Sequence, residues 1–150
     1  MIVEHTQDVL NSVGDIIQAD LTLDDTLQAG CVIQDIHVAF SLLEEEKLLV
    51  VACYLGCVSE DDTDLFFQVL KANYMWAYTG GATLSIDEST LQLCLHRVFE
   101  LPFEEIADIE EALSDILGAA EYWKKQLDSD DQSLGMADQT MHLGAHNIRI

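Results

Sequence analysis

Apolar and polar residues alternate with two different periods along the chain, and each change of period marks a new element. Apolar residues recur every three or four positions over residues 5–18, which predicts an amphipathic helix. The period then becomes two: residues 31–36 and 38–42 predict two strands, with a tight turn near Gln34 and Asp35. Residues 48–55 are apolar almost without interruption and predict a third strand, covered on both faces. Short connections between these strands favour an antiparallel meander.

The next segment is more apolar than a helix with one buried side requires. Asp62 or Thr63 is expected to cap a helix over residues 65–78, in which 11 of 14 residues are apolar. A helix that is apolar nearly all round is expected to be buried nearly all round. A domain this small cannot cover both sides of a peripheral helix. The pattern therefore predicts a symmetric dimer in which a second copy covers one side.

The second half of the chain repeats the change of period. Gly80 and Gly81 are expected to end the helix, because glycine adopts the left-handed conformation easily. Alternation predicts strands over residues 82–86 and 91–95, and Pro102 ends this region. A long amphipathic helix is predicted over residues 104–127, with acidic residues first and lysines last, the order that complements its dipole.

The predicted fold is an α+β domain over residues 1–127 with the element order α-β-β-β-α-β-β-α and a mainly antiparallel twisted sheet. Residues 128–150 show no period and contain several acids and glycines, which predicts an acidic, flexible C-terminal tail.

The large negative charge of the chain limits the kinds of molecule that it can bind. The 150 residues contain 28 acidic and 6 basic side chains, a net charge of −22, which opposes binding to nucleic-acid phosphates. Hydrophobic residues make up 49% of the chain, enough for a core. No apolar run is long enough to span a membrane, and no secretory signal is expected. The four cysteines, which lack a CxxC pair, are expected to be free and to pack as small hydrophobes: Cys31, Cys53, Cys57 and Cys94.

Candidate catalytic and metal-binding groups are sparse. His142 and His146, with Asp138 nearby, have a helical metal-ligand spacing but fall in the predicted tail, where a polar tail is the simpler interpretation. His5, His37 and His96 are interpreted as surface histidines. The acidic pairs Glu104/Glu105 and Glu110/Glu111 point about 100° apart on a helix, so neither pair converges on one reacting atom. No nucleophile or phosphate-loop motif is found, and we expect no enzyme, cofactor or metal.

The sheet offers apolar side chains that are expected to serve mainly as core, with part of them left to hold an extended peptide. The acidic charge would then attract basic segments of that client. The candidate client-binding residues are Val38, Phe40, Leu42, Leu49, Val51, Leu93 and Leu95.

The sequence resembles the class I type III secretion chaperones, the Tir chaperone family. The resemblance rests on a Leu-x-Ala-Asn pattern at Leu70–Asn73 leading into Thr79-Gly-Gly-Ala-Thr-Leu84, on Leu91–Leu95 followed by Leu101-Pro102, and on Ala120-Glu-x-Trp123. It covers about residues 5–127. Where the family usually has a proline after the third strand, this chain has Cys57-Val-Ser59.

The resemblance implies a cytoplasmic bacterial homodimer without enzymatic activity. Such a chaperone binds the N-terminal region of a secreted effector, keeps it secretion-competent and helps deliver it to the export apparatus, with the secretion ATPase as a further expected partner. The family dimerises through the second helix and the following strand, which implies an interface of Phe66, Leu70, Asn73, Tyr74, Ala77, Ala82 and Leu84. Two alternatives remain open: an acidic inhibitor or adaptor that binds a basic protein, and an enzyme subunit with carboxylate chemistry.

Overall fold

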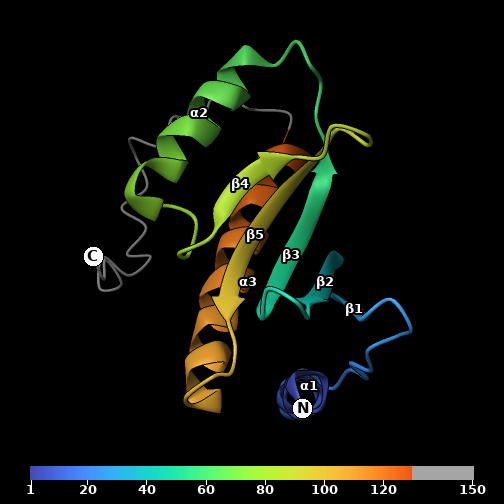
Figure 1. Cartoon of the computed structure of the whole chain (residues 1–150). Helices are drawn as coiled ribbons and strands as arrows, with labels where there is room; N and C mark the ends of the chain where they lie inside the picture. The colour runs from blue at the N-terminus through green and yellow to red at the C-terminus, as the bar shows by residue number, and fades with distance from the viewer. Residues whose placement is uncertain (130–150) are drawn as a thin grey trace.

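The computed structural model describes residues 1–129 and contains one five-stranded antiparallel sheet with the strand order β1-β2-β3-β5-β4 (Figure 1). The predicted element order α-β-β-β-α-β-β-α is confirmed. The elements in chain order are α1 (Ile2–Ile17), β1 (Gln28–Ile33), β2 (Ile36–Leu43), β3 (Leu48–Cys57), α2 (Thr63–Asn73), the short 3₁₀ helix η1 (Tyr74–Trp76), β4 (Thr83–Ile86), β5 (Gln92–Glu100) and α3 (Ile106–Asp128). Residues 130–150, which include His142, His146 and most of the predicted tail, lie outside the described part.

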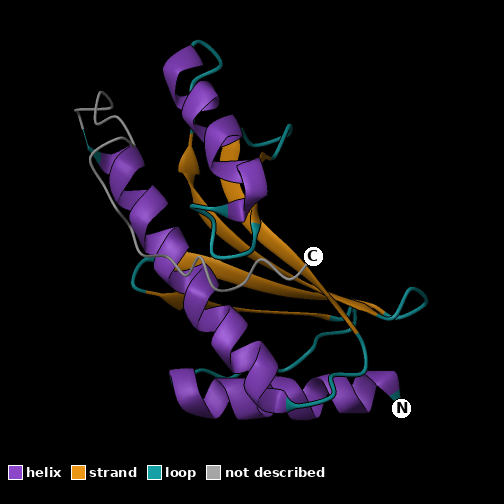
Figure 2. Cartoon of the chain, turned by 90° about the vertical axis from the view of Figure 1, so that its left-hand side faces the viewer, coloured by secondary structure: helices purple, strands orange, loops and turns teal. Residues whose placement is uncertain are grey.

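One face of the sheet carries the core. α3 runs along that face, and the N-terminal end of α3 crosses α1. α2 lies beside β4 at one edge of the sheet (Figures 1 and 2). Strict alternation in β2 and β3 directs every second side chain to the helices. Trp123, Phe40 and Leu10 are among the largest fully buried side chains. The core therefore belongs to a single subunit, and the opposite sheet face contributes half-buried and exposed positions.

The first two strands form the predicted tight hairpin. Gln34 and Asp35 have φ values of 50° and 65°, as a two-residue turn matched to strand twist requires. The hairpin register pairs Ile33 with Ile36 and Cys31 with Val38. The turn is therefore correctly predicted, although β1 begins three residues earlier than expected, at Gln28.

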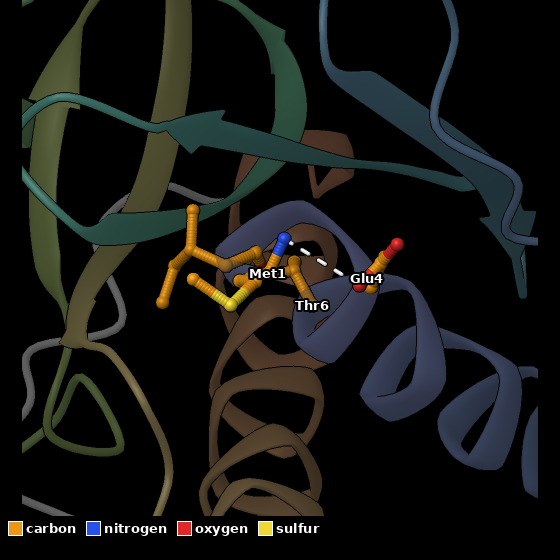
Figure 3. Close-up of polar contacts among 4 residues, drawn as sticks. Met1, Glu4 and Thr6 are labelled. Carbon is orange, nitrogen blue, oxygen red and sulfur yellow. Dashed lines mark hydrogen bonds and ion pairs between the residues drawn. The ribbon is translucent and has the colours of Figure 1, made fainter.

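Several boundaries differ from the predicted ones. β5 continues to Glu100 instead of ending near Leu95, because it pairs with the whole of β3 as far as Leu48 opposite Glu100. α1 begins at Ile2 rather than residue 5. In its first turn a surface ion pair of 3.5 Å joins the Met1 ammonium to Glu4 (Figure 3), and Thr6 Oγ1 donates to the Ile2 carbonyl at 2.8 Å.

The central helix is shorter than predicted. Asp62 caps it, since its carboxylate accepts a hydrogen bond from the Leu65 amide at 3.1 Å. The α-helix ends at Asn73, and the left-handed backbone of Met75 (φ 54°) and Trp76 (φ 53°) turns the chain away from the helix axis. The expectation that the helix continues to residue 78 is therefore wrong.

Gly80 and Gly81 have a different role from the predicted one, because the helix ends before them. Both have positive φ values, 61° and 78°. A Cβ at Gly80 would overlap the carbonyl oxygen of Asp115 on α3. Gly80 thus lets the connection between α2 and β4 approach the backbone of α3 closely, while a Cβ at Gly81 would meet the Arg97 side chain on β5.

Trp123 fixes the same connection. Its indole is fully buried and its Nε1 donates a hydrogen bond of 2.9 Å to the Tyr78 carbonyl. We expect Trp123→Phe to lower the free energy of unfolding by about 1–3 kcal/mol, because the carbonyl loses its partner and a cavity forms. Urea unfolding measures this change. The neighbouring change Tyr122→Phe, which keeps a half-buried ring, should cost less than about 1 kcal/mol, and an equal cost for both variants would contradict the assignment.

Candidate functional site

An uncovered apolar surface follows the outer side of α2 and η1. We call it the α2 apolar face; it consists of Phe67, Leu70, Tyr74, Met75 and Trp76, all exposed. Leu70 is 69% exposed and Tyr74 is 76% exposed, whereas Leu65, Val69 and Ala72 on the other side of the helix are buried. Side chains this large and this exposed in one contiguous stretch are typical of a surface that another protein covers.

The backbone that presents the α2 apolar face is strained. Met75 and Trp76 both adopt the left-handed region, which costs large side chains of the order of 1 kcal/mol each. The Lys71 ammonium lies over the Phe67 ring, 5.6 Å from its centroid, in a cation–π contact. Trp76 lies in this left-handed segment with 54% of its surface exposed.

The residues expected at the dimer interface divide into two groups. Leu70, Tyr74 and Ala77 are exposed, and Phe66 and Asn73 are half-buried. Ala82 and Leu84 are buried within the subunit, because their side chains point into the core beneath β4. Three exposed members that the resemblance does not supply, Phe67, Met75 and Trp76, extend the same surface.

The side chain of Asn73 is occupied within the subunit. Its Oδ1 accepts a hydrogen bond from the Leu84 amide at 2.8 Å, and its Nδ2 donates to the Leu84 carbonyl at 3.0 Å. Asn73 therefore bonds to β4 as a neighbouring strand would. The amide group is consequently not free to bond to a second subunit.

The seven candidate client-binding side chains lie in the core. Their exposed fractions range from 0% to 4%, since all of them point to the face covered by α1 and α3. The residues are Val38, Phe40, Leu42, Leu49, Val51, Leu93 and Leu95. In this structure they support the sheet, and a bound segment would have to reach other atoms of the subunit.

Such atoms are found at the free edge of the sheet. Leu27 accepts a hydrogen bond from Leu42 on β2, while Gln28 bonds outward, through both its amide and its carbonyl, to Asp24. The alternation of a strand then directs the backbone N–H and C=O groups of Gly30 and Val32 outward as well. We call these four groups the β1 edge. Val32 is 57% exposed, so the edge is accessible from solvent.

Carboxylates flank the β1 edge at both ends. Asp24 lies before the strand and Asp35 follows it. The Asp24 carboxylate accepts hydrogen bonds from the Thr26 hydroxyl at 2.7 Å, the Thr26 amide at 2.8 Å and the Gln28 amide at 3.0 Å, which lower its pKa. Asp24 therefore stays ionised well below neutral pH, and the edge presents negative charge to an incoming chain.

The outer sheet face beside this edge is hollowed. A volume of about 680 Å³ is lined by strand residues that include Gly30, Ala39 and Tyr54, with Asp87 from the turn between β4 and β5. Sequence reasoning missed this face because it examined the apolar phase of each strand. The available signal was the run of small and aromatic residues in the opposite phase of β2 and β3.

The cysteines are free, as predicted, and differ in burial. Burial raises the pKa of Cys53 to about 12 and that of Cys94 to about 11, with smaller contributions from neighbouring thiols and Asp87. Burial also raises the pKa of the half-buried Cys31, whereas Cys57 is exposed.

These differences predict thiol reactivity. At pH 8 one thiol per folded chain should react rapidly with Ellman's reagent, and all four should react in denaturant, because buried thiols remain protonated. Stopped-flow absorbance follows the reaction. Cys57→Ser should remove the rapid phase; a rapid phase that persists in this variant would place the reactive thiol elsewhere.

The remaining candidate metal-binding and catalytic side chains do not gather at one site in the described part of the chain. Within residues 1–129, no group of three or more histidine, cysteine or acidic side chains is placed to hold a metal ion. His37 is exposed as expected, but His96 is half-buried and its Nδ1 lies 3.0 Å from the Ser85 hydroxyl. His5 is also engaged, since its Nε2 accepts a hydrogen bond of 3.2 Å from the Phe103 amide. Among the helices of this described part, none has the length and hydropathy of a membrane span.

Solved structures share this fold. A chain in the crystal structure of the ExsC–ExsE complex has a TM-score of 0.70 at 21% identity, covering 83% of this chain and 95% of that chain. A chain in the HopA1–SchA chaperone–effector complex has a TM-score of 0.67 at 12% identity, with coverages of 82% and 95%. The ExoU–SpcU heterodimer from the type III secretion system of Pseudomonas aeruginosa gives 0.58 at 15% identity, with coverages of 79% and 94%. At these identities the likeness establishes the fold.

Family membership rests on the sequence itself. A search of curated proteins gives no match. The model of the Tir chaperone protein (CesT) family matches residues 9–124, which span α1 through nearly all of α3. This range includes the α2 apolar face, Asn73 and the β1 edge. The chain therefore belongs to the Tir chaperone protein (CesT) family.

Proposed function

We propose that this protein is a bacterial cytoplasmic chaperone that binds the N-terminal region of a type III secreted effector, keeps it secretion-competent and helps deliver it to the export apparatus. The observation that carries the proposal is the β1 edge: an accessible strand edge flanked by carboxylates, in a member of a chaperone family. The solved complex of SchA with HopA1 is a chaperone–effector complex of the same fold, which supports a client of this class.

The active form in this proposal is a homodimer joined through the α2 apolar face. Its three aromatic side chains, Phe67, Tyr74 and Trp76, each bury about 150–250 Å² when fully covered. Because 54–76% of each of these side chains is exposed, two copies together with Leu70 and Met75 supply an interface on the order of 1,000 Å², near the lower limit for a specific complex. Burial against a second copy would also compensate for the strained backbone at Met75 and Trp76.

The client in this proposal adds an extended strand to the β1 edge. The outward backbone groups of Gly30 and Val32 supply main-chain hydrogen bonds that do not depend on client sequence. The nearby carboxylates and the overall charge of −22 favour client segments that are basic. Ordering an extended client costs conformational free energy, so the affinity per unit of buried area is modest. The client can therefore dissociate from the chaperone before export.

The proposal assigns no catalytic step to the chain. Delivery to the export apparatus would involve contact of the loaded dimer with the secretion ATPase. The chaperone domain extends over residues 1–127 in this proposal, and residues 128–150 form an acidic tail outside the unit that binds the client.

Co-expression with candidate effectors tests the proposal. We expect an effector encoded beside this chain to co-purify with it, and deletion of the effector's N-terminal region to abolish co-purification. An acidic inhibitor or adaptor would instead retain a basic protein that is not secreted, independent of any N-terminal segment. Recovery of such a protein, together with failure of every neighbouring effector, would contradict the proposal.

A further inference from the structure

The two edges of the sheet are not equivalent. β1 and β4 are the outer strands, and each has one row of backbone groups that no neighbouring strand bonds. An uncovered row of this kind pairs readily with a strand of another chain. A protein that receives a guest strand must therefore keep one edge open and protect the other from its own copies.

The β4 edge is closed by groups that are not part of a strand. The Asn73 amide makes both hydrogen bonds that a neighbouring strand would make to Leu84, at 2.8 Å and 3.0 Å. The Ala82 amide, next along the same outward row, donates to the Thr79 carbonyl at 3.1 Å. In a strand of only four residues, these bonds leave Ile86 as the one outward position whose backbone has no hydrogen-bond partner within residues 1–129.

In the described part of the chain, no side chain closes the β1 edge as Asn73 closes the β4 edge. There the only outward position that is bonded is Gln28, at the beginning of the strand, among the described residues. Gly30 and Val32 lie in the middle of a six-residue strand, and Val32 is 57% exposed. Strand addition at Gly30 and Val32 disturbs no hydrogen bond among residues 1–129, whereas addition at β4 must first displace Asn73.

We propose that Asn73 is a positioning residue that closes the β4 edge, so that two copies of this chain do not pair through β4 and strand addition is confined to β1. Asn73 is also the last residue of α2, so its two bonds fix the end of the helix against the sheet and keep the α2 apolar face turned outward. This inference concerns the folded chain alone and does not depend on which client it binds.

Two variants at Asn73 test the proposal. Asn73→Ala removes both hydrogen bonds, and Asn73→Asp keeps the acceptor for the Leu84 amide but loses the donor to the Leu84 carbonyl. Hydrogen exchange of the purified full chain should show the Leu84 amide exchanging at least tenfold faster in Asn73→Ala, with a smaller change in Asn73→Asp. Sedimentation velocity should show Asn73→Ala forming assemblies larger than those of the wild type, because the β4 edges of two copies then pair.

A second substitution separates edge pairing from general unfolding. Ile86→Lys places a charge at the exposed end of β4, where it opposes strand pairing without restoring the lost bonds. The double variant Asn73→Ala/Ile86→Lys should return to the wild-type assembly size while its Leu84 amide still exchanges rapidly. Asn11→Ala, at an exposed position of α1, is the matched control and should change neither readout.

Two results would overturn the inference. If Asn73→Ala keeps the wild-type assembly size although its Leu84 amide exchanges rapidly, the amide does not guard the edge. If the larger assemblies persist after Ile86→Lys, they arise from unfolding or from another surface. Both results are independent of effector binding, so a client that fails to bind at the β1 edge leaves this test intact.

Discussion

Leu70→Glu is expected to convert the dimer to a monomer at micromolar concentration. Leu70 is 69% exposed at the centre of the α2 apolar face, so the substitution leaves the core of the subunit unchanged. In the proposed dimer the carboxylate would be buried among Phe67 and Tyr74 without a partner. We expect dimerisation to weaken by at least about 100-fold, or about 3 kcal/mol. Sedimentation equilibrium measures the dissociation constant.

A matched control is available on α1. Ile16 is 61% exposed and is equally apolar, but it lies on a different helix. Ile16→Glu should leave the dissociation constant within about twofold of the wild type. A wild-type chain that sediments as a monomer near 16.7 kDa, or equal effects of the two substitutions, would remove the α2 apolar face as the dimer surface.

Val32→Pro is expected to weaken client binding at least about tenfold while leaving the fold intact. Proline lacks the outward N–H of the β1 edge, and the bonds between β1 and β2 run through the residues on either side. We expect the affinity for an effector's N-terminal segment to fall at least about tenfold, because one main-chain bond is lost and the ring obstructs close pairing. Isothermal titration calorimetry measures the change.

The control for this variant keeps the backbone N–H. Val32→Thr retains the β-branched shape and should bind the client within about threefold of the wild type. Circular dichroism and urea unfolding establish that both variants remain folded. Unchanged affinity in a folded Val32→Pro chain would mean that the client does not pair with β1, and the hollow beside Tyr54 would then become the candidate contact.

The spacing of apolar residues predicted most of the helices and strands, because each element buries one side and the period of its apolar residues follows from its backbone geometry. Alternation over residues 38–42 identified β2, the apolar run over residues 48–55 identified β3, and the two-residue turn at Gln34 and Asp35 follows from strand twist. The end of α2 was missed because it depends on a tertiary contact with the next strand, β4, which the hydrophobic pattern does not encode. Eleven of the 14 residues 65–78 are apolar, which favours a longer helix. The hydrogen bonds from Asn73 to Leu84 hold the chain against β4, and the α-helix ends there.

The candidate binding surfaces were harder to predict than the helices and strands, because they too depend on how the elements pack against one another. A side chain such as Phe40 is apolar whether it faces the core or a client, and the position of α1 and α3 decides which. The β1 edge is invisible to any pattern of side chains, because its reactive groups belong to the backbone of Gly30 and Val32. Topology alone reveals that, within residues 1–129, β2 is the one strand beside β1.

Hydrogen exchange on the purified complex with the effector's N-terminal segment tests the central claim most directly. We predict protection of the Gly30 and Val32 amides of β1 that is absent in the free chain, while the bound segment remains extended. Exchange at Leu84 should remain unchanged, since the β4 edge is already closed by Asn73. Protection confined to β4 or α3, with β1 as exposed as in the free chain, would contradict the account.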